Sequence, residues 1–289
     1  MADPYKPNRR LTSHISSTAP ATGFIFSALV IYLGWFLLRQ ALTSLIPPDA
    51  MLGQTRFSFL LNLSFFVLLF ALTVSVARRS HRLDWRAFLG DQSRLVPDFA
   101  RTLLACLTVF AIIVVMGFDP FSATSRPLVG WLAFLPIALL GILIQTGAEE
   151  LYFRGFLHHF CSTYLRKPVL WLLIPSVAFG LTHMFNDTAS GATMAAYVVW
   201  ASAFGLACID LTARTGSLGA AWGLHMAVNV TGFLIAAPEN APMSGGALFL
   251  FPERTDEFIA EPALIWIATI FELFFLFVLW LAARNAVER

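Results

Sequence analysis

Residues 128–147 read LVGWLAFLPIALLGILIQTG, and this stretch decides the class of fold. It carries no acidic or basic side chain. Its length equals what an α-helix needs to cross the hydrocarbon of a bilayer, about 20 mostly apolar residues. Two carboxylates, Glu149 and Glu150, follow almost directly. The stretch therefore predicts a membrane-spanning helix with charged groups at its end.

The composition extends this interpretation to the whole chain. Of its 289 residues, 58% are hydrophobic and 12% are charged, and the mean hydropathy is +0.73. Soluble globular proteins have about 45–50% apolar and about 25% charged residues, so this chain has too little polar surface for a fold surrounded by water. The sequence predicts an integral membrane protein with one domain in the lipid bilayer. A net charge of +2 with scattered basic residues favours no nucleic acid as a partner.

Apolar runs of nearly the same length recur along the chain, bounded by charged residues, Pro or Gly. They predict an all-α, polytopic membrane helix bundle with about eight transmembrane helices. We expect these helices at residues 23–46, 57–77, 102–118, 128–147, 169–184, 192–211, 218–237 and 262–283. The fifth and seventh runs give the weakest signal, because each is short or interrupted by polar residues.

The basic residues predict the orientation of the bundle, because short cytoplasmic loops of membrane proteins are rich in Lys and Arg. With eight spans, most basic residues fall on the side that holds both chain ends, so we expect cytoplasmic N- and C-termini. The basic loop 78–101 has two interpretations, an amphipathic helix on the anionic inner surface or a solvated loop. The acidic loop 238–261 is expected to form an exposed flap on the outer side.

Charged residues inside membrane helices cost about 2.5–3.5 kcal/mol each on insertion scales and so predict a function. Glu150 and Arg154 are four residues apart, which places them on one helix face where they can pair. Glu149 lies about 100° further round the helix and can face another partner. This spacing predicts one carboxylate held by an arginine and one carboxylate available for chemistry.

Two later helices each carry a histidine that stands four residues from another residue of a motif. Phe179 and His183 lie one turn apart in the fifth run, and His225 and Asn229 lie one turn apart in the seventh. A lone histidine near a helix end is more often a packing residue than a catalyst. Together, however, three helices contribute groups suited to acid–base chemistry, oxyanion binding or metal ligation. This combination predicts a site for water-using chemistry in a protein cavity.

The three motifs, EExxxR at 149–154, FxxxH at 179–183 and HxxxN at 225–229, resemble in their order the signature of the CPBP family. This family comprises CAAX proteases and bacteriocin-processing membrane proteins and is also called the Abi family. The resemblance covers about residues 140–230. It implies four parts, which are a cytoplasmic N-terminal tail (1–22), variable N-terminal spans (23–127), a CPBP-like catalytic core (128–237), and an outer loop with the last span (238–289).

By this resemblance the protein is an intramembrane endopeptidase similar to the type II CAAX prenyl endopeptidase. Glu149 would act as general base on a water shared with His183, while His225 and Asn229 would stabilise the tetrahedral oxyanion. In support of these catalytic groups, Arg154 would neutralise Glu150 and fix the motif helix, with Phe179 beside them.

A zinc ion is an open alternative to this mechanism. Two histidines and one carboxylate match the ligand count of a catalytic zinc site, and the candidate ligands are His183, His225 and Glu149 or Glu150. Against zinc, the chain has no His-Glu-x-x-His helix, and Asn229 is a poor zinc ligand. The sequence favours a glutamate mechanism and establishes no cofactor with certainty.

The expected partner is a peptide or membrane-protein substrate, and the sequence does not say whether that substrate is prenylated. The expected location is the inner (cell) membrane of a bacterium. One alternative is a non-proteolytic member of the family that acts in bacteriocin immunity or as a membrane scaffold. A proton-coupled transporter is a weaker alternative, because the chain shows no internal repeat.

Overall fold

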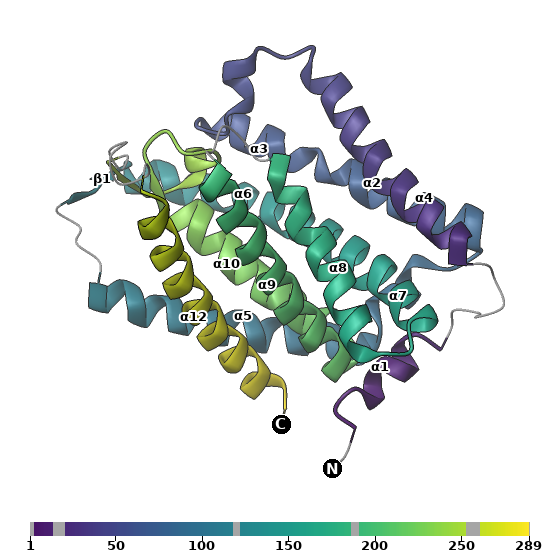
Figure 1. Cartoon of the computed structure of the whole chain (residues 1–289). Coiled ribbons are helices and arrows are strands. Elements are labelled where there is room, and N and C mark those ends of the chain that lie inside the picture. Colours follow the sequence, from purple (N-terminus) through teal and green to yellow (C-terminus); the bar gives the residue numbers. More distant parts are fainter. Residues whose placement is uncertain (1–2, 14–20, 118–121, 186–190, 253–260, 289) are drawn as a thin grey trace.

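The computed structural model describes residues 3–13, 21–117, 122–185, 191–252 and 261–288. In these ranges the chain forms a bundle of helices with a small sheet at one end (Figure 1). Helical stretches long and apolar enough to cross a membrane cover Ala21–Thr43, Arg56–His81, Gln92–Ile113, Leu128–Tyr164, Gly191–Thr215 and Pro262–Val287. These six stretches of the described residues support a helical membrane protein, but they are fewer than the about eight transmembrane helices expected.

The two weakest sequence signals correspond to two shorter apolar stretches, Pro168–Thr182 and Gly219–Ile235. In chain order the helices are α1 (Lys6–Leu11), α2 (Ala21–Thr43), α3 (Arg56–Ser64), α4 (Phe66–His81), α5 (Gln92–Gly117), α6 (Leu128–Glu150), α7 (His158–Tyr164), α8 (Pro168–Thr182), α9 (Gly191–Thr215), α10 (Gly219–Val230) and α12 (Pro262–Val287). Short 3-10 turns are η1 (Pro48–Met51), η2 (Trp85–Leu89), η5 (His183–Phe185) and η7 (Ser244–Gly246).

Two segments are π-helical, and each follows directly on a helix that carries a motif. The first, η4 (Leu151–Leu157), joins α6 to α7 without a break, and the second, η6 (Thr231–Ile235), extends α10. Short π-helical stretches inside α-helices occur frequently at functional sites. Because η4 and α7 continue α6, the fourth span does not end at residue 147 as expected.

The interpretation of 78–101 as an amphipathic surface helix is wrong. α4 runs to His81 and α5 begins at Gln92 rather than at residue 102, so the segment holds the end of α4, the turn η2 and the first turns of α5. Phe88 of η2 is fully buried, with its ring 5.7 Å from that of Phe156. The apolar side chains of this segment therefore anchor it to the bundle.

A small sheet lies at the end of the bundle away from both termini (Figure 1). Its strands are β1 (Thr124–Ser125), β2 (Ala236–Pro238) and β3 (Phe249–Phe251), in the order β1-β3-β2. β3 pairs antiparallel with β1 and parallel with β2, so that Leu250 is the partner of both Thr124 and Ala237. The flap expected at 238–261 is therefore partly wrong, since the turn η7 is buried, while 253–260 lie outside the described residues.

Close packing of α10 on α5 places the third motif in the centre of the bundle. A Cβ atom on Gly219 would lie 2.2 Å from the carbonyl oxygen of Leu95, and one on Gly223 would lie 2.5 Å from that of Phe99. Two glycines four residues apart allow this approach, because small residues let the backbones of membrane helices come together. The same helix carries His225 and Asn229.

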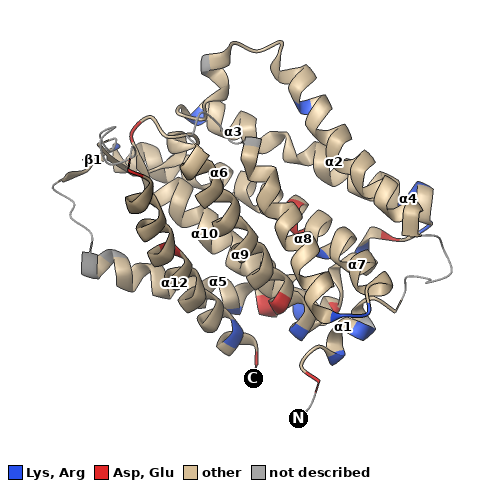
Figure 2. Cartoon of the chain, viewed as in Figure 1, with Lys and Arg blue, Asp and Glu red and all other residues tan. Residues whose placement is uncertain are grey.

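Most Lys and Arg side chains lie toward the end of the bundle that also holds both termini (Figure 2). Such an asymmetry is what the distribution of basic loops along the sequence predicts. Which side of the membrane this end faces stays a prediction, with the cytoplasm as the expected side.

Candidate active site

The first motif lies at the end of α6, where an arginine holds one of two adjacent glutamates. Nη1 of Arg154 is 3.0 Å from Oε1 of Glu150, and both side chains are fully buried. The structure thus confirms the pairing expected from the spacing of the two residues. A buried ion pair of this kind persists only when further groups surround the charges.

Three aromatic rings surround the guanidinium of Arg154. Its central carbon lies 4.5 Å from the ring centroid of Phe179, 5.8 Å from that of Phe204 and 5.9 Å from that of Phe153. Aromatic faces attract a guanidinium, so they compensate in part for the loss of water around the buried cation. Phe179 of the second motif therefore contacts the arginine of the first.

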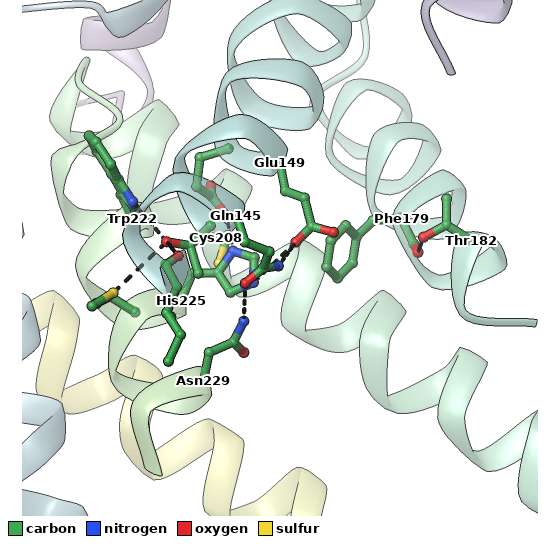
Figure 3. A network of polar contacts seen from close by, with 12 residues as sticks. Gln145, Glu149, Phe179, Thr182, Cys208, Trp222, His225 and Asn229 are labelled. Atoms are coloured by element: carbon green, nitrogen blue, oxygen red, sulfur yellow. Dashed lines mark hydrogen bonds and ion pairs between the residues drawn. The ribbon is translucent and has the colours of Figure 1, made fainter. Parts of the chain in front are cut away.

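His225 of the third motif lies between the two glutamates (Figure 3). Its Nδ1 is 2.7 Å from Oε1 of Glu150, the oxygen that also binds Arg154. Because an ionised carboxylate only accepts hydrogen bonds, Nδ1 is the donor. On the other side of the ring, Nε2 is 3.4 Å from Oε2 of Glu149. His225 therefore links both carboxylates.

Gln145 is a member of the site that the sequence analysis did not single out. Its Nε2 donates to Oε2 of Glu149 over 2.6 Å, and its Oε1 accepts a hydrogen bond from Nδ2 of Asn229 over 2.7 Å (Figure 3). Gln145 stands one helical turn before Glu149, so a polar residue on the face of Glu149 was the available signal. A continuous chain of polar contacts thus runs from α6 to α10.

His183 stands apart from this chain of contacts. Its Nδ1 lies 3.0 Å from the carbonyl oxygen of Phe179, and within the described residues no hydrogen bond joins it to Glu149. The Phe179 ring lies between the two histidines, with its centroid 4.9 Å from that of His183 and 6.1 Å from that of His225. With Nδ1 donating to the backbone, Nε2 of His183 is left as an acceptor.

The geometry does not fit the zinc site that the sequence left open. Within the described ranges, no group of three His, Cys, Asp or Glu side chains is close enough to hold a metal ion. Both ring nitrogens of His225 face carboxylates, and one of them donates to Glu150. A nitrogen that donates a hydrogen bond has no lone pair for a metal.

Glu149 and Glu150 differ in how much of each side chain is exposed. The side chain of Glu149 is 15% exposed, whereas those of Glu150 and Arg154 are fully buried and that of His225 is 4% exposed. Part of the Glu149 side chain thus lies at the surface of the protein, whereas Glu150 lies wholly inside. The site thus has one partly exposed carboxylate, Glu149, which contacts Gln145 and His225. Beside it lies the buried ion pair of Glu150 and Arg154.

Comparison with known proteins agrees with this geometry. The chain is 27% identical over 171 residues to the uncharacterized protein YyaK of Bacillus subtilis (strain 168), an alignment that covers 59% of this chain and 54% of that protein. The chain thus matches about half the length of this bacterial relative. No solved structure matches it. Residues 130–231, which include every residue of the polar site, match the family described as type II CAAX prenyl endopeptidase Rce1-like. Over these residues the chain is therefore similar to the Rce1-like type II CAAX prenyl endopeptidase family.

Proposed function

We propose that this protein is a membrane-embedded endopeptidase that hydrolyses peptide bonds of a peptide or membrane-protein substrate, with Glu149 activating the water. The observation that carries this proposal is the contrast between two adjacent glutamates. Glu150 is buried between Arg154 and His225, whereas Glu149 is partly exposed. A general base must reach the proton that it removes, and Glu149 is the carboxylate of this pair that a water can approach.

In the first step, Glu149 takes a proton from water while the water oxygen attacks the carbonyl carbon of the substrate. Gln145 donates to one oxygen of this carboxylate and so holds its orientation. His183 would accept the second hydrogen of the water at Nε2, since its Nδ1 is engaged by the backbone of Phe179. The product of this step is a tetrahedral intermediate with a negative oxygen.

In the second step, hydrogen-bond donors stabilise that oxygen while the bond to the leaving nitrogen breaks. Asn229 has two hydrogens on Nδ2 and uses one of them on Gln145, so the other is available to the oxyanion. To donate from Nε2 as well as from Nδ1, His225 would have to carry a proton on both nitrogens, and a carboxylate lies on each side of its ring. Donors placed in advance at an oxyanion each lower the barrier by about 2.7–4 kcal/mol. Glu149 then returns its proton to the leaving amine.

The test compares membranes that contain the native protein with membranes that contain Glu149→Gln at equal abundance. Mass spectrometry identifies newly formed peptide termini in both. The matched control is Glu272→Gln, which removes a carboxylate from an exposed position on α12. Termini that disappear with Glu149→Gln and persist with Glu272→Gln support the endopeptidase and identify its substrates.

An unchanged set of termini in all three membranes would overturn the proposal. The family alternative would then be a non-proteolytic role, such as bacteriocin immunity or scaffolding. In that case cells with Glu149→Gln should not show the phenotype that deletion of the gene produces.

A further inference from the structure

A hollow outside the polar site lies where α4 ends and the turn η2 begins. Its volume is about 410 Å³, and its lining residues are Arg78, Arg82, Leu83, Asp84, Trp85 and Arg86. Ligand pockets commonly have volumes of about 300–1,000 Å³. None of these residues belongs to the proposed catalytic machinery.

A left-handed residue shapes this hollow. Arg82 ends α4 with φ 56° and ψ 31°, and the amide of the next residue, Leu83, donates back to the carbonyl oxygen of Ala77. This sharp turn brings the chain of η2 back over the last turn of α4, so that Arg78 and Arg86 line the same space. Glycine or asparagine usually occupies such a position, because a Cβ atom is disfavoured there. An arginine at this position costs conformational energy and adds a cation to the hollow.

The charges around the hollow are unbalanced. Three arginines line it together with one acidic residue, Asp84. One oxygen of Asp84 accepts a hydrogen bond from the backbone amide of Arg86 at the start of η2. In the part of the chain that the structure describes, none of the three arginines forms an ion pair. The hollow therefore has an excess of positive charge that no described side chain neutralises.

The surroundings place the hollow at the level of a membrane surface. The candidate span Arg56–His81 ends between Arg78 and Arg82, and this is the basic end of the bundle (Figure 2). Trp85 packs edge-on against Phe70 of α4, with ring centroids 5.4 Å apart. Tryptophan is enriched at the boundary between hydrocarbon and water. A ligand in the hollow would lie beside the lipid headgroups.

From these observations we propose that the hollow is a binding site for a phosphate group, held by Arg78, Arg82 and Arg86. Guanidinium groups bind phosphate oxygens through paired hydrogen bonds, and basic pockets at the ends of membrane helices bind anionic headgroups. The phosphate can come from an anionic phospholipid or from a soluble phosphate compound, and the two sources share this chemistry.

The experiment uses the full chain in two arms. In the first arm, the protein is reconstituted in vesicles of phosphatidylcholine with phosphatidylglycerol, extracted with mild detergent, and its retained phosphatidylglycerol is counted by native mass spectrometry. In the second arm, lipid-free protein in detergent is titrated with inorganic phosphate, and its thermal unfolding temperature is recorded. Three forms are compared. The first is the native chain, and the second is the hollow variant, which combines Arg78→Gln, Arg82→Gln and Arg86→Gln. The third is a control with the same loss of charge.

The control is the triple variant Arg79→Gln, Arg166→Gln and Lys167→Gln. Arg79 lies in the last turn of α4, and the other two residues lie between α7 and α8. We expect all three on the same side as the hollow, which they do not line. A contact with a basic residue at a membrane surface contributes about fivefold in affinity, so the hollow variant should lose well over tenfold in one arm or both. Loss in the lipid arm alone identifies a headgroup, and loss in the phosphate arm identifies a soluble phosphate compound.

Equal effects of the two triple variants in both arms would overturn the proposal, because they would show an unspecific attraction to positive charge. Binding that is the same in all three forms would overturn it as well. Should the glutamine variant not fold, Arg78→Lys with Arg82→Lys and Arg86→Lys keeps the charge but removes the paired donors, and it should still bind more weakly than the native chain.

Discussion

The carboxamide of Gln145 donates to Oε2 of Glu149 over 2.6 Å from one helical turn earlier on α6. The same group accepts a hydrogen bond from Asn229 on α10, so it connects the proposed base with a proposed oxyanion donor. Gln145 itself need not touch the substrate. Its expected role is to hold two catalytic side chains in a fixed relation.

Gln145→Leu should therefore lower kcat and leave KM unchanged. Loss of a hydrogen bond to a charged group corresponds to about 1.5–3 kcal/mol, or about a tenfold to hundredfold slower reaction. Steady-state cleavage of a substrate identified from the membrane comparison measures both constants. Gln145→Glu keeps the size and the acceptor for Asn229 but loses the donor to Glu149, so it should also be slow. A rise in KM without a change in kcat would contradict the positioning role.

Removal of Arg154 should destabilise the fold more than removal of an exposed arginine. Arg154→Met leaves Glu150 buried without its cation, and breaking a buried pair in this way costs about 3–5 kcal/mol. The control Arg101→Met removes a side chain that is 56% exposed and 3.9 Å from Asp98, where an ion pair contributes at most about 1 kcal/mol. Thermal unfolding in detergent compares the two. If both variants unfold at the same temperature, the buried pair does not stabilise the fold.

The close contact between α5 and α10 predicts a contrast between two glycines of one continuous helix. Gly223→Ala would place a methyl group 2.5 Å from the carbonyl oxygen of Phe99, and forcing atoms into a packed interface typically costs about 1–3 kcal/mol. Gly232→Ala, one element further along, meets no atom within 4 Å and should leave the stability unchanged or slightly raised. Unfolding temperatures of both variants check this difference, and equal values would contradict it.

We expect the protein to lose stability at high pH because of Tyr5 in its N-terminal segment. Burial, aided by the hydrogen bond of 2.8 Å from its hydroxyl to Oδ1 of Asp210, raises the pKa of Tyr5 from 10.0 to about 12. The folded state therefore holds this proton more tightly than the unfolded state. The resulting stability is complete below pH 10 and is lost as the pH rises through 12.

Tyr5→Phe should abolish this particular pH dependence. Phenolate absorbance is followed during a pH titration of both folded proteins, and the step near pH 12 should contain one tyrosine fewer in the variant than in the native protein. If the curves differ instead near pH 10, the pKa of Tyr5 is not raised.

Local spacing along the chain accounts for the parts of the site that could be predicted. The pair Glu150 and Arg154 follows from an i, i+4 relation on one helix. The length of the apolar runs also located the six long candidate spans of the described residues, and the two weakest runs correspond to two shorter apolar helices. Each of these features depends on one helix at a time.

Contacts between helices account for what was missed. That His225 faces both glutamates depends on the rotation of α10 against α6, which no single segment specifies. Gln145 was overlooked because one uncharged polar residue in an apolar run carries little signal until Asn229 is seen opposite it. The start of α5 at Gln92 was missed because charged residues in its first turns resemble a loop.

The uninterrupted course of α6 has a consequence for the depth of the reaction in the bilayer. From Leu128 to Glu149 the helix advances about 32 Å at 1.5 Å per residue, which is close to the whole thickness of the hydrocarbon layer. The continuous helix runs on through η4 to α7, where the ring of Phe160 lies 5.3 Å from that of His81 at the end of the span Arg56–His81. Phe160 stands about 16 Å of helix beyond Glu149, so Glu149 lies deeper in the bilayer than the basic boundary. A substrate would then have to bring its scissile bond below the headgroups of the basic side, to the depth of Glu149.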